Sequence, residues 1–464
     1  MTQPSTRGPA GTPPRTSLIK VVAASMLGTT VEWYDFFLYG VAAAIVLPHV
    51  FFPAADPVAG TLLSFGTFAI GFVARPLGGL VFGHYGDRLG RKKLLVVSLL
   101  LMGLSTFAIG LLPGYATIGV AAPALLVLLR LIQGFALGGE WGGAVLIVSE
   151  HGDARRRGFW ASWPQAGAPA GQLLANGLLA LLAVVQSEEA FNDWGWRIPF
   201  LLSAVLVLIG LYVRLSVEES PVFRDAQAKA AERATEGTAR TLPIVEVLRR
   251  YPREVLTAMG ARFAENVSYY IFTIVVSTYM KERFGLPSSF VLGAVLIGAA
   301  VHVVTIPLWG LVSDRIGRRP VYLLGAVGVG AWAFAFFALL DTQNFGLTVL
   351  AVVGGLIFHG AMYGPQGAFL SELFGTGVRY SGVSIGYQLA SVAAGGLAPL
   401  ISVALLASFG TGFAIAVYVA ASSVLTLVAV ASYRETRNRD LAADDGFGDD
   451  RAPALPDGAT TARS

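Results

Sequence analysis

The chain has 464 residues, of which 55% are hydrophobic and only 13% are charged. Soluble domains carry about 25% charged residues, so this composition, with a mean hydropathy of +0.64, leaves too little polar surface to cover a soluble particle. There is no cysteine, which excludes disulfides, thiol catalysis and cysteine-held metals. The net charge of +4 does not indicate nucleic-acid binding, because the basic residues gather at the ends of apolar runs.

Apolar runs of about 20 residues, long enough to cross the hydrocarbon core as helices, lie between short charged clusters. Barrel strands would instead show alternating segments of about 10 residues, so the runs predict an all-α integral membrane protein. We predict twelve transmembrane helices, over residues 19–47, 59–84, 94–112, 119–149, 159–185, 196–215, 253–280, 290–313, 320–340, 346–372, 379–407 and 411–432. An even number places both termini on one side of the membrane.

The connections between these helices differ in charge, and the difference predicts the orientation. Basic residues concentrate on alternate connections: Arg88, Arg91, Lys92, Lys93, Arg155, Arg156, Arg157, Arg315, Arg318 and Arg319. The opposite connections are poor in Lys and Arg. Because these residues accumulate on the cytoplasmic side of membrane proteins, we expect both termini in the cytoplasm.

A long polar connection divides the predicted helices into two groups of six. We expect a disordered cytoplasmic tail over 1–18, an N-terminal six-helix bundle over 19–215, a cytoplasmic linker over 216–252, a C-terminal six-helix bundle over 253–433 and a disordered cytoplasmic tail over 434–464. A ten-residue segment that starts at Gly83 recurs at Gly310, 227 residues later, and Glu150 has a counterpart in Glu372, 222 residues later. Repeats at nearly one offset indicate two homologous halves.

Several motifs resemble those of known proteins. The ten-residue segment reads Gly-x-x-x-Asp-Arg-x-Gly-Arg-Lys/Arg in both copies and is similar to the loop motif of the major facilitator superfamily. Segments 31–36, 70–87, 133–142 and 364–388 resemble its metabolite:proton symporter family, and Gly-Gly-Glu-Trp-Gly-Gly at 138–143 is similar to the shikimate, alpha-ketoglutarate and other organic-acid symporters. The resemblance implies two pseudo-symmetric six-helix bundles and proton-coupled uptake across the plasma (inner) membrane of a bacterium.

Seven charged residues stand well inside the predicted helices: Glu32, Asp35, Arg75, Arg130, Glu140, Arg262 and Glu265. A charge at the bilayer centre costs at least about 2.5–3.5 kcal/mol and marks a functional site by default. The alternative is a set of internal salt bridges that only fix the packing. Polar residues from Arg262 to Thr273 fall on one helical face, which favours a shared cavity.

We expect the acidic residues to exchange the coupling proton, and these candidates are Glu32, Asp35, Glu140 and Glu265. Arginine binds carboxylates through two parallel hydrogen bonds, so arginines and their polar or aromatic neighbours are the candidates for substrate binding: Tyr34, Arg75, Arg130, Gln133, Trp141, Arg262, Asn266, Tyr270, Gln366, Tyr387 and Gln388. His302 and His359 could relay protons, although packing within apolar helices is the favoured interpretation for both.

The repeated loop motif predicts a gate. Asp87 and Asp314 can accept hydrogen bonds from helix N-termini. The gate arginines Arg88, Arg91, Arg315 and Arg318 can pair with the glutamates Glu150 and Glu372. The alternative is that these arginines only enforce topology.

Together these features favour a proton-coupled symporter that imports a small organic acid by alternating access. Its expected partners are an anionic small molecule and the lipid bilayer, without nucleic acid, an obligate protein partner, a metal or any cofactor other than the proton. The alternatives are a zwitterionic osmolyte (proline or betaine) symporter, a drug or metabolite exporter, a multipass membrane enzyme and a non-transporting sensor. An enzyme is not expected, because no nucleophile cluster, metal motif or phosphate-binding Gly-x-x-x-x-Gly-Lys-Ser/Thr loop occurs in the sequence.

Overall fold

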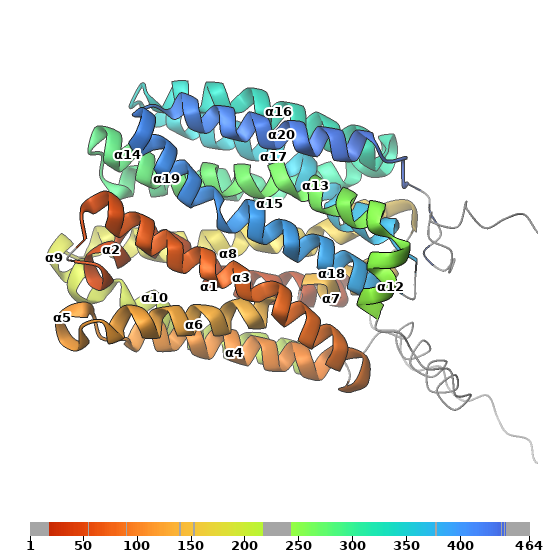
Figure 1. Cartoon of the computed structure of the whole chain (residues 1–464), viewed down its shortest axis with the longest axis horizontal. Helices are drawn as coiled ribbons and strands as arrows, with labels where there is room; N and C mark the ends of the chain where they lie inside the picture. The colour runs from red at the N-terminus through yellow and green to blue at the C-terminus, as the bar shows by residue number, and fades with distance from the viewer. Residues whose placement is uncertain are drawn as a thin grey trace, which may run out of the picture.

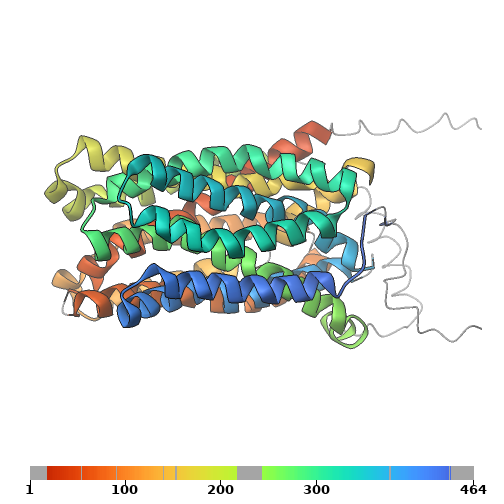
Figure 2. The ribbon, with the colours of Figure 1, turned by 90° about the horizontal axis from the view of Figure 1, so that it is seen from above.

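A computed structural model of the chain describes residues 18–53, 55–89, 91–138, 141–151, 154–216, 243–375, 378–437, 439 and 441. All secondary structure in these residues is helical. The helices run side by side along the long axis of the molecule (Figures 1 and 2). This arrangement satisfies every backbone group within its own helix, as the hydrocarbon core requires.

The first half of the chain forms six long helical segments. They are α1 (Leu18–Ile45), α3 (Pro57–Leu89), α4 (Arg91–Leu111), α6 (Ala121–Leu137) with α7 (Trp141–His151), α8 (Arg157–Val185) and α10 (Arg197–Ser216). Short elements lie at their ends: α2 (Leu47–Phe51), α5 (Tyr115–Ile118), η1 (Ala154–Arg156), α9 (Glu188–Ala190) and η2 (Phe191–Gly195).

The second half forms six more segments, preceded by the short amphipathic helix α12 (Pro243–Arg250). They are α13 (Pro252–Tyr270) with η3 (Ile271–Val275) and α14 (Val276–Phe284), α15 (Ser288–Ile316), α16 (Arg318–Leu340), α17 (Phe345–Leu373), α18 (Arg379–Ala390) with η4 (Ser391–Gly396) and α19 (Ala398–Phe409), and α20 (Gly412–Ala431). The expected all-α fold of twelve helices in two bundles is therefore confirmed.

The two bundles meet along a few helices. Figure 1 shows the helices up to α10 in one half of the molecule and α13 to α20 in the other. The contacts between bundles run from α8 to α15 and α17, and from α3 to α18, η4 and α19. The centre of the molecule is therefore bounded by α1 and α3 on one side and by α13 and α18 on the other.

Among the described residues, eight segments are both long and apolar enough to cross a membrane by length and composition. The exceptions are α4, whose apolar part is short, and α1, α8 and α13 with α14. The last three carry polar residues that are buried in the protein interior, such as Asp35, Gln172 and Glu265. Their lower hydropathy therefore reflects a position at the centre and not a position outside the membrane.

Three predicted helices have features that the prediction did not include. In the helix predicted over 119–149, α6 and α7 are described, and the carbonyl of Gly138 after α6 accepts a hydrogen bond from Gln388 Nε2 of α18 at 2.8 Å. The helices predicted over 253–280 and 379–407 contain the π-helical turns η3 and η4. Such turns occur frequently at functional sites, and hydrophobic periodicity does not reveal them.

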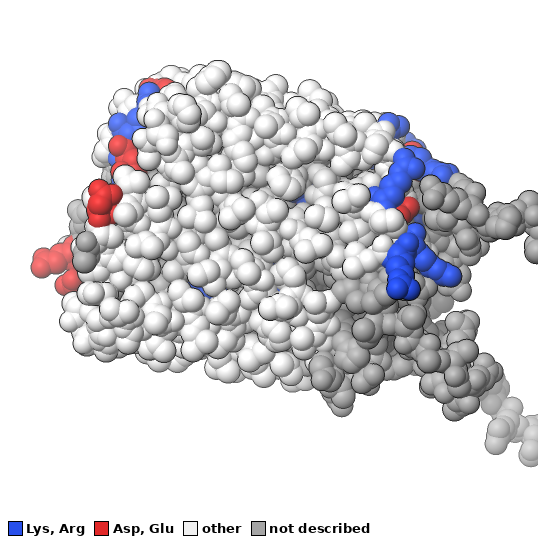
Figure 3. Space-filling model, viewed as in Figure 1, with Lys and Arg blue, Asp and Glu red and all other residues white. Residues whose placement is uncertain are grey.

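On the face seen in Figure 3, the exposed charged residues lie at the two ends of the long axis, with an almost uncharged surface between them. One end, here called the basic end, carries exposed Lys20, Arg155, Arg249, Arg250, Arg253 and Arg315. The first residues of α1 and the last residues of α20 both lie at this end (Figure 1). The band between the ends matches the hydrocarbon core of a bilayer.

Glycines allow α3 and α6 to approach until their backbones touch. A Cβ atom on Gly134 would lie 1.8 Å from the carbonyl oxygen of Gly71, and one on Gly78 would lie 1.8 Å from that of Phe135. Small residues at such contacts are typical of packed membrane helices. The position of Arg130, one turn before Gly134, depends on this contact.

We expect Gly134→Ala to lower the midpoint of thermal unfolding of the purified protein in detergent. The added methyl group must push α6 away from α3, and such overpacking costs about 1–3 kcal/mol. Gly66→Ala, in α3, is the matched control, because the added Cβ atom would meet no heavy atom within 4 Å. An unchanged midpoint for Gly134→Ala would contradict the close approach of the two helices.

Candidate functional site

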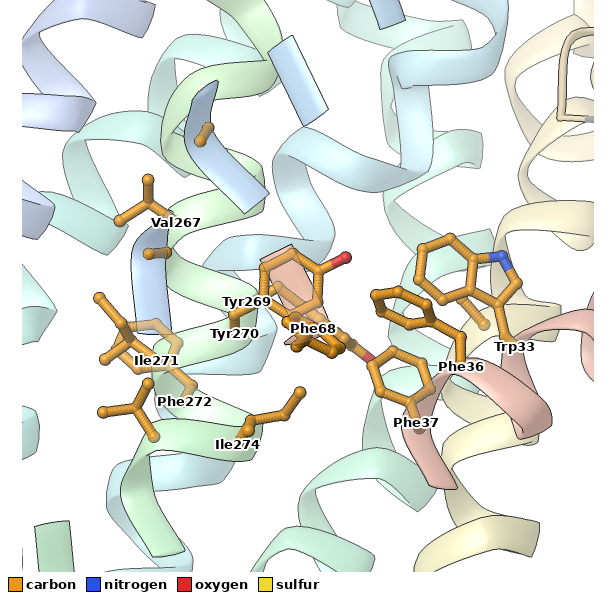
Figure 4. Close-up of a cluster of buried hydrophobic side chains, with 14 of the residues drawn as sticks. Trp33, Phe36, Phe37, Phe68, Val267, Tyr269, Tyr270, Ile271, Phe272 and Ile274 are labelled. Atoms are coloured by element: carbon orange, nitrogen blue, oxygen red, sulfur yellow. The ribbon is translucent and has the colours of Figure 1, made fainter. Parts of the chain in front are cut away.

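Aromatic side chains from both bundles fill the space between α1 and α13. Figure 4 shows six of these rings together: Trp33, Phe36 and Phe37 of α1, Phe68 of α3, and Tyr269 and Tyr270 of α13. The ring centroids of Phe36 and Tyr270 are 5.9 Å apart, and those of Phe37 and Tyr269 are 5.5 Å apart. The bundles therefore contact each other through aromatic rings at the level where η3 begins.

Two arginines of the N-terminal bundle lie on these rings. The Arg75 guanidinium carbon is 4.0 Å from the ring centroid of Phe72, and that of Arg130 is 3.8 Å from the ring centroid of Tyr39. Each side chain is only 3% exposed. Among the described residues, neither forms an ion pair with a carboxylate. Cation–π contacts thus stabilise two buried charges without neutralising them.

Hydrogen bonds lead from Arg130 to Thr106, which lies beside Asp35. Arg130 Nη1 donates to Gln133 Oε1 at 2.9 Å, and Gln133 Nε2 donates to the hydroxyl of Thr106 at 2.7 Å. The Thr106 hydroxyl donates to the carbonyl of Met102 at 3.1 Å and lies close enough to the buried Asp35 carboxyl group to interact with it. Glu32, one turn earlier in α1, is also buried and lies close enough to Arg75 for their charges to interact. Both predicted carboxylates of α1 thus lie near an arginine.

The C-terminal bundle places a paired arginine opposite these residues. Arg262 Nη1 lies 2.9 Å from Glu265 Oε2 and donates to Gln366 Oε1 at 2.8 Å. Arg262 Nη2 donates to Asn266 Oδ1 at 3.2 Å, and the guanidinium stacks 3.4 Å from the ring centroid of Tyr387. Arg262 and Glu265, which are three residues apart on α13, therefore form a buried ion pair.

Arg262 and Arg75 are close enough across the bundle interface for their charges to repel each other, and Arg75 similarly repels Arg130. Three buried guanidinium groups therefore follow one another across the centre. Among the residues that the structure describes, Arg262 is the one of the three that pairs with a carboxylate, that of Glu265. Arg75 and Arg130 are therefore buried guanidinium groups that form no ion pair among the described residues.

Glu265 contacts His359, which in turn contacts a second histidine, His302. His359 Nε2 lies 3.3 Å from Glu265 Oε1, and His359 Nδ1 lies 3.0 Å from His302 Nε2. Both histidines are fully buried. The three residues come from α13, α17 and α15, so the contacts link three helices of the C-terminal bundle. The prediction favoured packing for these histidines and missed the chain that they form.

Little free volume remains at the centre. Two voids of about 10 Å³ each lie beside Arg130 and beside Glu265, which is too small for a metabolite. A larger cavity of about 290 Å³ lies at the end opposite the basic end, between α3, α14 and α19, where Thr61, Thr278 and Glu282 contribute to its lining. Ligand entry to the centre therefore requires the bundles to separate.

The basic end is closed by two backbone hydrogen bonds and an ion pair between the bundles, supported by ion pairs within the C-terminal bundle. The Asp314 carboxylate of α15 accepts hydrogen bonds from the backbone N–H groups of Gly158 and Phe159, both at 2.8 Å, at the start of α8. Arg318 lies 2.6 Å from Asp314 and 3.4 Å from Glu372. Glu372 also pairs with Arg157 of α8 at 2.9 Å. These are the contacts expected of a gate for Asp314, Arg318 and Glu372.

Two expectations for this end are affected. Arg315 is exposed and forms no ion pair with Glu372, while its other predicted partner, Glu150, has a side chain outside the described residues. Part of the tail expected over 434–464 packs against the basic end, since Thr436 is 1% exposed and its hydroxyl donates to Glu372 at 2.7 Å. Glu435 accepts from the backbone N–H of Arg318 at 2.8 Å.

Other predicted residues lie apart from the centre or outside the described part. Tyr34 donates to the carbonyl of Pro199 in α10 at 2.8 Å, which directs its hydroxyl into the N-terminal bundle. Gln388 bridges to Gly138. Glu140 lies outside the described residues, as do the side chains of Trp141, Asp87, Arg88, Arg91 and Glu150.

Several residues of the site were not predicted as functional. Thr106 and Tyr39 gave no signal, because single hydroxyls are common in apolar helices. His359 did give one, since His359, Tyr363 and Gln366 recur at intervals of four and three residues and therefore share one face of α17. The partner of His359, His302, comes from another helix and could not be found from spacing.

Two six-helix bundles around a buried polar centre define a transporter of the major facilitator superfamily. The chain matches the sugar (and other) transporter family over residues 20–445, and it belongs to this family. It is a multi-pass membrane transporter and not an enzyme.

The relatives include three proteins of Escherichia coli strain K12. The inner membrane metabolite transport protein YhjE is 45% identical over 92% of this chain and 97% of its own length. The shikimate transporter is 41% identical over 91% and 96%, and the proline/betaine transporter is 36% identical over 91% and 85%. The xylose transporter XylE of E. coli, in a partially occluded inward-open structure, superposes with a TM-score of 0.70 at 19% identity over 91% of this chain and 99% of that one, which supports the fold.

We expect Glu372→Gln to weaken the closure of the basic end, because Arg157 and Arg318 lose their shared carboxylate and breaking a buried pair costs about 3–5 kcal/mol. The chain contains no cysteine, so Ala168→Cys, beside the central void, is a specific reporter. In membrane vesicles, a thiol reagent added from the basic side should label it faster in the Glu372→Gln background. The exposed Arg315→Gln is the matched control, and equal rates in all three backgrounds would argue against the gate.

Proposed function

We propose that this protein is a proton-coupled symporter of the bacterial inner membrane that takes up a small metabolite carrying a carboxylate. The observation that carries the proposal is the set of three buried guanidinium groups of Arg75, Arg130 and Arg262, of which Arg75 and Arg130 form no ion pair among the described residues. A buried charge without a partner is costly, so a ligand carboxylate that pairs with Arg75 and Arg130 stabilises the centre. Relatives named as metabolite and shikimate transporters support this class of substrate.

The basic end faces the cytoplasm in this proposal, following the distribution of Lys and Arg, so both termini are cytoplasmic. The ion pairs around Asp314 and Glu372 close that side, and the cavity of about 290 Å³ is where the bundles begin to separate toward the outside. In alternating access, the basic end then opens while the outer end closes, and the central residues are exposed to one side at a time.

Coupling to protons, in this proposal, acts through the hydrogen bonds that lead from Arg130 to Thr106 beside Asp35. A substrate that takes the donors of Arg130 disturbs Gln133, Thr106 and through them Asp35. A carboxylate that loses the stabilising influence of a nearby cation holds a proton more readily. Asp35, Glu32 and Glu265 are therefore the proton-coupling residues of the proposal, to which the sequence adds Glu140.

The proposal is tested with purified protein in liposomes that contain a pH indicator. Addition of one small carboxylate from a panel, shikimate among them, should acidify the lumen. Asp35→Asn should abolish the proton flux, and Arg130→Ala should lower substrate affinity by about 10- to 100-fold, the loss of a charge-assisted hydrogen-bonded contact of about 1.5–3 kcal/mol. Arg253→Gln, at the exposed basic end, is the control.

A zwitterionic osmolyte is the second candidate. The proline/betaine transporter relative and the aromatic rings around Arg75 favour it, because quaternary ammonium groups bind aromatic faces. Proton flux with betaine or proline and none with any simple carboxylate would replace the first candidate with this one. Substrate flux without any proton movement would overturn symport itself.

A further inference from the structure

The chain of Glu265, His359 and His302 is a linear arrangement and not a ligand cluster. Contacts of 3.3 and 3.0 Å join the three side chains in order, and the described residues include no group of acids and histidines that could hold a metal. His302 Nδ1, at the end of the chain, is buried without a hydrogen-bond partner. A chain with these distances can hold one additional proton, because each imidazole ring has one nitrogen that can accept a proton.

Few charged or titratable groups of the described part face this chain. Tyr269 of α13 stacks near both rings, with centroid distances of 5.7 Å to His302 and 4.8 Å to His359. Its hydroxyl donates to Gln172 of α8 at 2.8 Å. The other groups are Tyr363, on the same helix as His359, Tyr322 of α16, which hydrogen bonds with Gln366, and Arg262 beyond Glu265.

Arg262 occupies the point where this chain meets the proposed substrate site. In the closed structure its charge is balanced by Glu265. A substrate carboxylate between the bundles competes with Glu265 for the same guanidinium. Once Arg262 pairs with the substrate, Glu265 is a buried carboxylate without its cation, a situation that costs several kcal/mol unless a new positive charge forms beside it.

We propose that the His359–His302 pair supplies this positive charge and is the proton-binding site of the C-terminal bundle, filled when substrate takes Arg262 from Glu265. This inference rests on the proposed symport and assigns the group that holds the proton. Arg262 exchanges the Glu265 carboxylate for the substrate carboxylate. Glu265 exchanges Arg262 for the imidazolium ion of the histidine pair. Buried charge remains balanced in both states.

The proton moves without any net rearrangement of the backbone. A proton that arrives at Glu265 forms the carboxylic acid, which donates to His359 Nε2. His359 then releases the proton on its Nδ1 to His302 Nε2, and His302, which already carries a proton on Nδ1, becomes the imidazolium. Glu265 is again a carboxylate and accepts a hydrogen bond from His359 Nε2–H. Reversal of these steps releases the proton when the substrate leaves.

The first test compares His302→Gln and His359→Gln with the wild type in liposomes. Exchange of labelled substrate at equal concentrations on both sides needs no net proton movement and should persist. Accumulation driven by an imposed pH gradient should fall by about tenfold, within the usual range of coupling between two binding events. The protons taken up per substrate bound by purified protein in weakly buffered detergent should fall as well.

His49→Gln is the matched control. His49 lies in α2 near the end opposite the basic end and outside the predicted spans, and partial burial together with nearby Lys281 holds its pKa below the usual value. This variant should accumulate substrate like the wild type. Wild-type accumulation and proton uptake in both His302→Gln and His359→Gln would overturn the inference.

Nitrogen NMR of histidine-labelled wild-type protein gives a test that does not depend on the folding of a variant. The chain has five histidines, and addition of substrate should convert one neutral imidazole signal into an imidazolium signal. Unchanged histidine signals at saturating substrate would also overturn the inference. A wild type that moves substrate without protons would instead refute the proposed symport, so the two failures are distinguishable.

Discussion

Positive charge held away from water at the junction of two helix bundles is the constraint on which the rest of this structure depends. Guanidinium groups are weakly hydrated and stack well on aromatic faces, which explains why Arg75, Arg130 and Arg262 each lie on a ring. Phe36, which both Arg75 and Arg130 also approach, is one of the rings that bring α1 into contact with α13. The central charge and the closed packing are therefore two consequences of one set of contacts.

The two halves share sequence motifs but treat their buried charge differently. In the N-terminal bundle, the central arginines Arg75 and Arg130 form no ion pair among the described residues, and Arg130 donates to Gln133, which donates to Thr106. In the C-terminal bundle Arg262 contacts Glu265 directly, and two histidines extend the contact. The halves are thus alike in helix order and unlike in chemistry, which gives a ligand at the junction two different environments.

The helices could be predicted from the sequence because long apolar runs and the charge of their connections are local properties. The buried charges on α1, α3, α6 and α13 could be predicted for the same reason. The π-helical turns η3 and η4 could not, since they conserve hydrophobicity while shifting the hydrogen-bonding register. The pairing of His302 with His359, and of Thr436 with Glu372, joins residues 57 and 64 positions apart, and no spacing rule within one helix reports such contacts.

The segment after α20 is part of the closed basic end. Glu435 accepts hydrogen bonds from the backbone N–H groups of Arg318 and Arg319 at the start of α16, Thr436 shares Glu372 with the gate arginines, and the carbonyl of Arg439 accepts from Arg157 of the other bundle. This segment therefore contacts both bundles. A fused protein or a cellular factor that displaces the segment would change the rate at which this side of the transporter opens.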